Sequence, residues 1–175
     1  RNVLSERKLM NEPTSISLVS GGFDPLHSGH VNYIEDALQY GEIVILLNSD
    51  EWLTQKKGRP FMPWEERARV MGSLKGVTEV IAFNDMKGDA TDGIQKAVNK
   101  YPYPEYRVSF LNGGDRTLSS TPEVEWCQAL SINCIFGVGG DKTQSSSWIL
   151  KDWETQPTKR IWGQWRVLKD YPPHH

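Results

Sequence analysis

The chain has 175 residues, of which 38% are hydrophobic and 24% charged, and its formal net charge at pH 7 is −2. These values are typical of one globular domain with a real core, and they argue against a broad electrostatic surface for nucleic acid. No apolar run approaches the roughly 20 residues of a membrane-spanning helix, and residues 1–9 lack the apolar stretch of a secretory signal, so we expect a cytoplasmic protein.

The first predicted unit is a strand, a glycine-containing turn and a helix. Residues 16–20 form a short apolar run, and the apolar residues of 31–38 recur at helical spacing. Between them lies the decapeptide Gly21-Gly22-Phe23-Asp24-Pro25-Leu26-His27-Ser28-Gly29-His30. Unpaired backbone N–H groups at the start of a helix bind anions, helped by the positive end of the helix dipole. Two histidines at that position predict a polyphosphate as the anion.

Strands and helices then alternate along the chain. Residues 42–48 form a nearly continuous apolar run, typical of a parallel strand that is covered on both faces. A loop is expected over residues 54–60, and a helix is expected to begin at Pro63. Further strands are predicted over 78–83, 106–111 and 132–138, and further helices over 90–100, from Pro122 and from Ser145. This order predicts an α/β fold, a Rossmann-like doubly wound parallel sheet of about five strands with helices on both faces.

Sheets of this kind bind ligands at the carboxyl ends of their strands, where the strand order reverses. The polar segments of this chain follow predicted strands. They are the histidine pair, Asn48-Ser49-Asp50, Gly113-Gly114-Asp115 and Ser145-Ser146-Ser147. We therefore expect these segments to converge on a single site.

A protein-held metal is not expected at this site. His27 and His30 have no third histidine or cysteine at ligand spacing. Cys127 and Cys134 lie seven residues apart, which is not the spacing of a metal pair. We expect both thiols to be buried or inert.

The decapeptide resembles the G-x-F-D-x-x-H-x-G-H motif of the cytidylyltransferase-like nucleotidylyltransferases, and the resemblance covers about residues 16–150. It implies an enzyme that transfers CMP or AMP from a nucleoside triphosphate to a phosphorylated small acceptor and releases pyrophosphate. It further implies Mg²⁺ bound with the nucleotide and a homodimer. From the net charge and the lack of a long apolar run, we expect neither nucleic acid nor a membrane as a partner.

The resemblance also implies which residues hold the triphosphate. In the family, the first motif binds it through its backbone and both histidines. The corresponding positions of this chain are Gly22, Phe23, His27, Gly29 and His30. Asp24, in the same motif, is expected to be either a turn organiser or a member of a metal shell.

Two later segments match further nucleotide-binding motifs of the family. Ser145-Ser146-Ser147-Trp148-Ile149 resembles I-S-S-T-x-I, which binds phosphates through hydroxyl and N–H groups. The match departs from the family at Thr143 and Gln144. Gly113-Gly114-Asp115 corresponds to the family's G-G-D, which implies contact with the base or ribose.

A central segment resembles the acceptor-binding part of heptose-phosphate adenylyltransferases, N-S-D…K-G-x-R-P…x-R. It runs from Asn48 through Lys57-Gly58-Arg59-Pro60 to Arg67. Glycerol-3-phosphate cytidylyltransferases carry a similar lysine-rich loop. The resemblance implies that Lys56 or Lys57 binds the acceptor phosphate with Arg67 nearby, and the alternative is a solvated basic loop. The residues expected to be catalytic are His27, His30, Lys57 and Ser146.

These matches favour a sugar phosphate as the acceptor. One alternative is a glycerol-3-phosphate cytidylyltransferase-type enzyme of lipid or wall precursor synthesis. Another is a non-catalytic nucleotide-binding module, which the departures at Thr143 and Gln144 favour and the intact histidine pair disfavours. The motifs do not decide between ATP and CTP.

The nucleotidylyltransferase domain is expected to span residues 13–152. Residues 153–175 change character, with three tryptophans, three prolines and little helical periodicity. Residues 159–168 resemble the opening strand of the cupin domain in mannose-6-phosphate isomerase-type proteins. The alternative is an extended tail that packs its tryptophans on the domain or on a partner.

Overall fold

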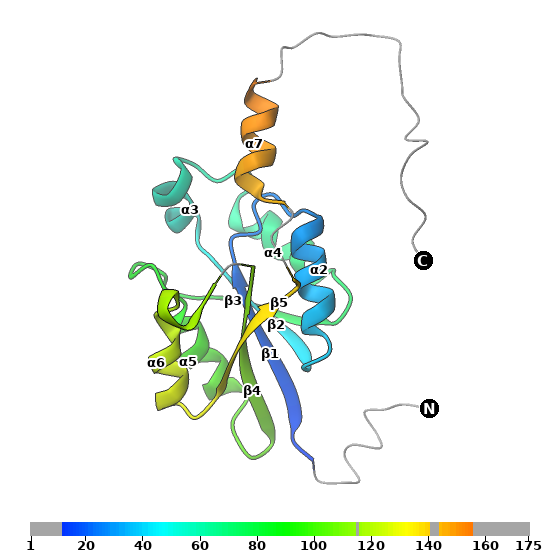
Figure 1. Ribbon diagram of the computed structural model, residues 1–175, viewed down its shortest axis with the longest axis vertical. Coiled ribbons are helices and arrows are strands. Elements are labelled where there is room, and N and C mark those ends of the chain that lie inside the picture. The colour runs from blue at the N-terminus through cyan, green and yellow to red at the C-terminus, as the bar shows by residue number, and fades with distance from the viewer. Residues whose placement is uncertain (1–11, 115, 141–143, 156–175) are drawn as a thin grey trace.

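The computed structural model describes residues 12–114, 116–140 and 144–155, and within them five parallel strands form one sheet in the order β3-β2-β1-β4-β5. The strands are β1 (Thr14–Gly21), β2 (Glu42–Leu47), β3 (Val77–Ala82), β4 (Tyr106–Gly113) and β5 (Asn133–Val138). The strand order reverses at β1, which has β2 on one side and β4 on the other. The predicted Rossmann-like fold is confirmed (Figure 1).

Helices cover both faces of the sheet. They are α2 (Ser28–Ala37), α3 (Asp50–Lys57), α4 (Trp64–Gly72), α5 (Thr91–Lys100), α6 (Glu123–Ala129) and α7 (Ser146–Thr155), with a 3₁₀ turn over Leu118–Ser120. One core cluster joins the sheet to α5 and α6, and the other joins it to α2 and α4. Both α3 and α7 lie beyond the carboxyl ends of the strands, at the top of Figure 1. None of the helices described is long and apolar enough to cross a membrane.

Strand β2 is buried on both of its faces. All of its residues from Ile43 to Leu47 are 0% exposed. Because side chains alternate along a strand, Val44 and Leu46 enter one core cluster, while Ile43, Ile45 and Leu47 enter the other. The nearly continuous apolar run of the sequence therefore corresponds to a central strand between two layers of helices.

Helix α3 occupies much of the segment for which a loop was expected. The hydroxyl of Ser49 caps it by accepting a hydrogen bond from the backbone N–H of Trp52 at 3.0 Å. Gly58 ends it with a φ of +91°. The loop prediction for residues 54–60 was wrong because α3 is short and largely exposed, and only Leu53 of its residues is buried, so it leaves little apolar periodicity. Residues 153–155 continue α7, and the cupin-like segment 159–168 lies outside the described residues.

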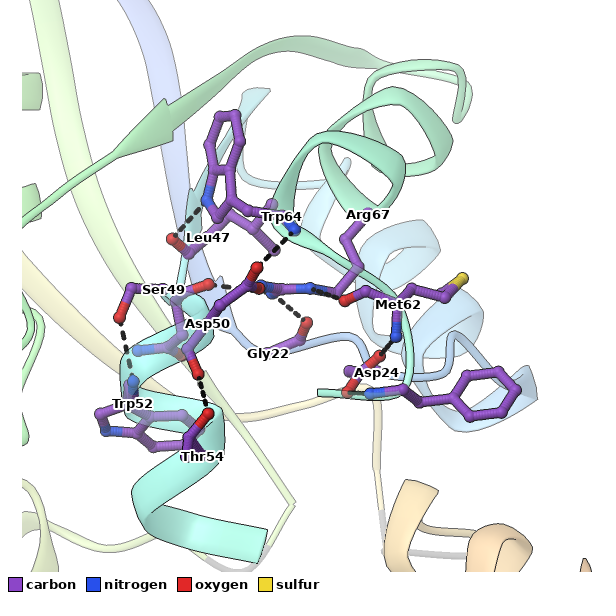
Figure 2. Close-up of polar contacts among 12 residues, drawn as sticks. Gly22, Asp24, Leu47, Ser49, Asp50, Trp52, Thr54, Met62, Trp64 and Arg67 are labelled. Atoms are coloured by element: carbon purple, nitrogen blue, oxygen red, sulfur yellow. Dashed lines mark hydrogen bonds and ion pairs between the residues drawn. The ribbon is translucent and has the colours of Figure 1, made fainter. Parts of the chain in front are cut away.

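The side chain of Arg67 connects the ends of two strands to α3 and α4 (Figure 2). It lies in α4 and is 0% exposed. Its Nη1 donates to the carbonyl oxygens of Gly22 and Asn48, both at 2.9 Å, and its Nε donates to the carbonyl of Met62 at 3.0 Å. Its Nη2 pairs with Oδ1 of Asp50 at 2.5 Å. Gly22 directly follows β1 and Asn48 directly follows β2, so one guanidinium fixes both strand ends.

Asp50 extends this connection to the start of α4. Its second carboxylate oxygen accepts a hydrogen bond from the backbone N–H of Trp64 at 3.2 Å. The indole N–H of Trp64 donates to the carbonyl of Leu47 at 3.3 Å. An acidic side chain at a helix N-terminus is stabilised by the helix dipole as well. The start of α4 is thus bound both to the end of β2 and to the start of α3.

We predict that Arg67→Met destabilises the protein strongly. The substitution removes the donors of three carbonyl groups and leaves Asp50 without its buried partner, which costs about 3–5 kcal/mol. Equilibrium unfolding in urea measures the loss. Arg69→Met is the matched control, because Arg69 lies on the exposed side of the same helix and should change the free energy of unfolding by less than about 0.5 kcal/mol. Equal losses in the two variants would show that the Arg67 contacts carry no special stability.

Candidate active site

A cavity of about 380 Å³ opens at the carboxyl ends of β1 and β4. Its wall is formed by the loop after β1 with the first turns of α2, by α3, by the ends of β4 and β5 with the loops after them, and by the start of α7. The structure therefore brings together the histidine pair, the two lysines, Gly113-Gly114 and the serine triplet. The cavity lies beside β1, where the strand order reverses, as expected for a doubly wound sheet.

The rings of His27 and His30 lie stacked in this wall. Their centroids are 3.7 Å apart with an angle of 22° between the ring planes. Phe23 packs edge-on against His30 with a centroid distance of 4.9 Å. A Cβ at Gly29 would lie 3.1 Å from the His27 ring, so glycine gives that ring room over the first turn of α2. Both rings are half-buried, and both line the cavity.

The environment of His30 keeps its ring neutral. Burial, and after it the neighbouring His27, lowers the pKa of His30 from 6.5 to about 3. Its Nδ1 is buried and has no hydrogen-bond partner among the described residues. A neutral imidazole offers one N–H donor to a ligand. An anion bound beside the ring would raise this pKa, because an opposite charge favours the protonated form.

Two helix N-termini border the cavity beside these rings. His27 is the N-cap of α2, and residues 145–147 stand at the start of α7. Ser145 caps α7 by accepting a hydrogen bond from the backbone N–H of Trp148 at 3.2 Å. Ser146 donates its hydroxyl hydrogen to the carbonyl of Pro25 at 2.8 Å. This bond connects α7 to the histidine loop, which is the segment of residues 22–27 between β1 and α2. The exposed Ser147 also lines the cavity.

Asp24 of the histidine loop forms a buried pair with Lys57 of α3. The carboxylate of Asp24 is 2% exposed and accepts hydrogen bonds from the backbone N–H groups of Phe61 and Met62, both at 2.7 Å. The ammonium group of Lys57 pairs with this carboxylate at 2.5 Å and donates to the carbonyl of Asp24 at 2.6 Å. Of the two roles expected for Asp24, this geometry matches that of a turn organiser. It also gives Lys57 a fixed position at the edge of the cavity.

Lys56 is the more exposed of the two lysines. It lines the cavity from the last turn of α3, and its ammonium nitrogen lies 4.4 Å from the ring centroid of Trp52. This distance is within the range of a cation–π interaction. The basic segment predicted to meet the acceptor thus faces the cavity from a helix instead of a loop.

Arg67 does not have the position expected of an acceptor-binding residue. It is fully buried beneath the histidine loop and is not among the residues that line the cavity. Its guanidinium is occupied by three carbonyl groups and by Asp50, as described above. This corrects the prediction that Arg67 binds the acceptor, because a side chain held on four sides by protein atoms serves the scaffold.

The ends of β4 and β5 approach α2 closely at Tyr33. The hydroxyl of Tyr33 donates to the carbonyl of Leu111 at 2.6 Å, and burial raises the pKa of this phenol. A Cβ at Gly113 would lie 3.1 Å from the Tyr33 ring, and one at Gly139 would lie 2.7 Å from the Tyr33 Cα. Gly139 also has a φ of +81° and donates its N–H to Asp36 at 2.8 Å. These glycines allow the two strand ends to line the cavity with backbone.

Several expected contacts cannot be described in the structure. Asp115 and Thr143 lie outside the described residues. Gln144, at the edge of that gap, lines the cavity. In the part of the chain that the structure describes, no three His, Cys, Asp or Glu side chains gather as a metal site. Neither cysteine is in a disulfide, and burial raises the pKa of Cys127 to about 12, so its thiol is unreactive.

Two charged residues in or near the cavity wall were not predicted from the sequence. Asp85 is 4% exposed and accepts hydrogen bonds from the side chain of Asn48 and from both the N–H and the hydroxyl of Ser49. It therefore holds the turn before α3, but no periodicity marks an aspartate in a loop. Arg116 lines the cavity and lies 3.9 Å from the carboxylate of Glu123. Its place directly after Gly113-Gly114-Asp115 was the available signal.

Comparison with known proteins identifies a family model that matches most of the chain. The model is described as Cytidylyltransferase-like, and it matches residues 18–169. The superfamily predicted from the first motif is thereby confirmed. The match includes the histidine loop, the lysines of α3 and the serines of α7.

Curated relatives match a shorter part of the chain. The Bifunctional protein HldE of Aliarcobacter butzleri is 41% identical over 81 residues, which is 45% of this chain and 17% of that protein. The protein of the same name from Alcanivorax borkumensis is 35% identical over 94 residues, which is 48% of this chain and 20% of that protein. The chain thus matches a fifth or less of the length of these relatives.

Solved structures share the fold at low sequence identity. A lipopolysaccharide core biosynthesis protein from Thermoplasma volcanium has a TM-score of 0.53 and 20% identity, over 70% of this chain and 94% of that one. A Vibrio parahaemolyticus protein assigned as a nicotinate-nucleotide adenylyltransferase has a TM-score of 0.54 and 13% identity, over 83% of this chain and 85% of that one. At these identities the likeness concerns the fold.

The low pKa of His30 predicts how stability depends on pH. The unfolded chain binds a proton at this histidine below pH 6.5, whereas the folded protein does so only near pH 3. The free energy of unfolding should therefore fall as the pH is lowered from 6.5, by up to about 1.4 kcal/mol per pH unit. His30→Gln cannot titrate and should lose less stability between about pH 7 and about pH 5 in urea unfolding. An identical fall in both proteins would contradict the buried, neutral state of His30.

Proposed function

Because the chain belongs to the cytidylyltransferase-like family, we propose that it transfers a nucleotidyl group, CMP or AMP, from a nucleoside triphosphate to a phosphorylated small acceptor and releases pyrophosphate. The observation that carries the proposal is the stacked pair His27 and His30, in the cavity wall at the start of α2. These histidines occur together with a stacked partner ring, a helix N-terminus and a glycine at position 29. A histidine that only packs in the core or binds a metal would not require this combination.

The reaction needs positioning and charge stabilisation more than covalent help from the protein. An oxygen of the acceptor phosphate forms a bond to the α-phosphorus, and the bond from that phosphorus to the bridging oxygen of pyrophosphate breaks. Negative charge grows on the phosphate oxygens during this step. N–H donors that are already aimed at those oxygens lower the barrier, because they need no reorganisation. The histidine ring N–H groups and the free N–H groups of α2 and α7 would supply these donors.

The protonation state of His30 suits this role. The free protein presents a neutral ring, because the pKa of His30 is about 3. A triphosphate beside the ring raises that pKa and increases the positive charge where the transition state needs it. His27 is stacked on the same ring, so one bound anion would act on both histidines.

We propose a sugar phosphate as the acceptor and assign its phosphate to Lys56. Lys57 is paired with the buried Asp24, whereas Lys56 is exposed at the cavity. An ammonium on a flexible side chain is a suitable point charge for a phosphate. The resemblance of the segment from Asn48 to Pro60 to heptose-phosphate adenylyltransferases supports a sugar as the remainder of the acceptor.

Mg²⁺ would enter with the nucleotide and be held by phosphate oxygens and water. Asp24, the carboxylate of the loop that carries His27, already accepts two backbone hydrogen bonds and pairs with Lys57. The described residues do not gather a protein ligand set for a metal. The residues present therefore do not fit a metal held by the protein itself.

Pyrophosphate release tests the proposed function. The wild-type protein, given CTP or ATP, Mg²⁺ and a panel of phosphorylated sugars and polyols, should release pyrophosphate with at least one acceptor. His30→Ala should lower turnover at least about tenfold, as the loss of a preorganised donor does, with little change in melting temperature. Tight nucleotide binding without any turnover would instead favour a non-catalytic nucleotide-binding module. A melting temperature that collapses together with activity would contradict the role of His30.

Substitution of the two lysines separates acceptor binding from scaffolding. Lys56→Ala should raise the KM for the acceptor about tenfold, leave the KM for the nucleotide unchanged and preserve stability. Lys57→Ala should lower the free energy of unfolding by about 1–3 kcal/mol, because it leaves the buried carboxylate of Asp24 without its cation. Lys96→Ala is the control, since Lys96 lies exposed on α5 away from the cavity. Unchanged acceptor KM values in Lys56→Ala would remove that lysine from the site.

A further inference from the structure

Trp52 presents an indole ring to the cavity from α3. Besides the histidines, the aromatic residues among the described lining are Phe23, Tyr33 and Trp52. Phe23 is 3% exposed and packs on His30, and the hydroxyl of Tyr33 is bound to a carbonyl. Trp52 is half-buried, so part of a large apolar ring faces a cavity that is otherwise rich in polar groups.

The position of Trp52 is fixed by the scaffold. Its backbone N–H is capped by Ser49, which is itself held by Asp85. The adjacent Asp50 is paired with Arg67 (Figure 2). A Cβ at Gly22 would lie 3.7 Å from the indole, so the ring rests close to the start of the histidine loop. Because the protein already holds Trp52 in place, its side chain loses little conformational freedom when a ligand binds.

A positive charge accompanies this ring. Lys56 follows Trp52 by one helical turn, and its ammonium nitrogen lies 4.4 Å from the ring centroid. The ammonium lies over the ring, so an apolar surface and a cation occur together, and this combination is complementary to a molecule that has an apolar face and an anionic group. A sugar ring with a phosphate has both features, because one face of the ring carries mainly C–H bonds. Glycerol phosphate has the anionic group and lacks a rigid face.

The sheet topology separates this surface from the other aromatic wall. Trp52 belongs to the helix that follows β2, on one side of β1. Tyr33 contacts Gly113 and Gly139 at the ends of β4 and β5, on the other side. The backbone at Gly113 is the part expected to meet the nucleotide, so the wall at Trp52 is left for the acceptor.

We propose that Trp52 and Lys56 form an acceptor subsite that selects cyclic sugar phosphates over acyclic polyol phosphates. The sugar ring lies with its C–H face on the part of the indole that the Lys56 ammonium does not cover, and the phosphate is held between Lys56 and the histidine pair. This inference rests on the proposed function, and it adds the residue that decides the acceptor class.

Acceptor kinetics of Trp52 variants test the subsite. With a hexose phosphate as acceptor, Trp52→Leu should lower kcat/KM at least about tenfold, because leucine keeps the apolar bulk but has no flat face. Trp52→Phe should restore part of the loss, because phenylalanine has a smaller flat ring. With glycerol 3-phosphate, both variants should stay within about threefold of wild type, as should the KM for the nucleotide. Trp126→Leu, on α6 and 40% exposed, is the control and should change none of these values.

The outcomes distinguish the subsite from the proposed function. If the wild-type protein releases pyrophosphate but Trp52→Leu lowers kcat/KM equally for both acceptors, or raises the KM for the nucleotide instead, the subsite is wrong and the function stands. Wild-type turnover with glycerol 3-phosphate and with no cyclic acceptor would also overturn the subsite. Absence of pyrophosphate release with every acceptor would overturn the proposed function and the subsite together.

Discussion

The buried guanidinium of Arg67 is the constraint on which the geometry of the cavity depends. It joins the carbonyl groups that follow β1 and β2 to the carboxylate at the start of α3. A planar group with five donors can satisfy several acceptors at once, whereas a lysine ammonium has three donors and no fixed plane. The burial of this charge is tolerated because carbonyl dipoles and Asp50 replace the water that it loses. The strand ends, and with them the histidine loop and α3, are consequently held in one arrangement.

The histidine loop is fixed at further points beyond this one. Asp24 is held by two backbone N–H groups and by Lys57, and the carbonyl of Pro25 accepts a hydrogen bond from Ser146 of α7. His27 and His30 follow within a few residues of these contacts, so their rings have little freedom. Donors held in place before the ligand arrives stabilise charge more effectively than donors that must move. Thus charged residues that do not line the cavity can matter to the proposed chemistry as much as those that do.

The sequence predicted those features that periodicity or a local motif encodes. Apolar runs such as residues 42–48 predicted the strands, and the decapeptide predicted a turn that opens a helix. The sequence predicted α3 poorly, because a short exposed helix is defined by its Ser49 cap and by tertiary contacts more than by an apolar face. The prediction that Arg67 binds the acceptor was wrong because its role, too, depends on tertiary contacts. A residue's type and its place on a helix do not reveal whether its partners will be ligand or backbone, and these partners are 45 and 19 residues away in sequence.

The position of β1 in the sheet also suits the in-line geometry that the proposed reaction requires. An in-line displacement requires the attacking oxygen and the leaving pyrophosphate to lie on opposite sides of the α-phosphorus. The glycine-lined ends of β4 and β5 lie to one side of β1, and the helix with Trp52 and Lys56 follows the strand on the other side. The histidine loop begins where β1 ends, between these two walls. A nucleotide on one wall and an acceptor on the other would therefore meet at the histidines, which is where the transferred phosphate needs its donors.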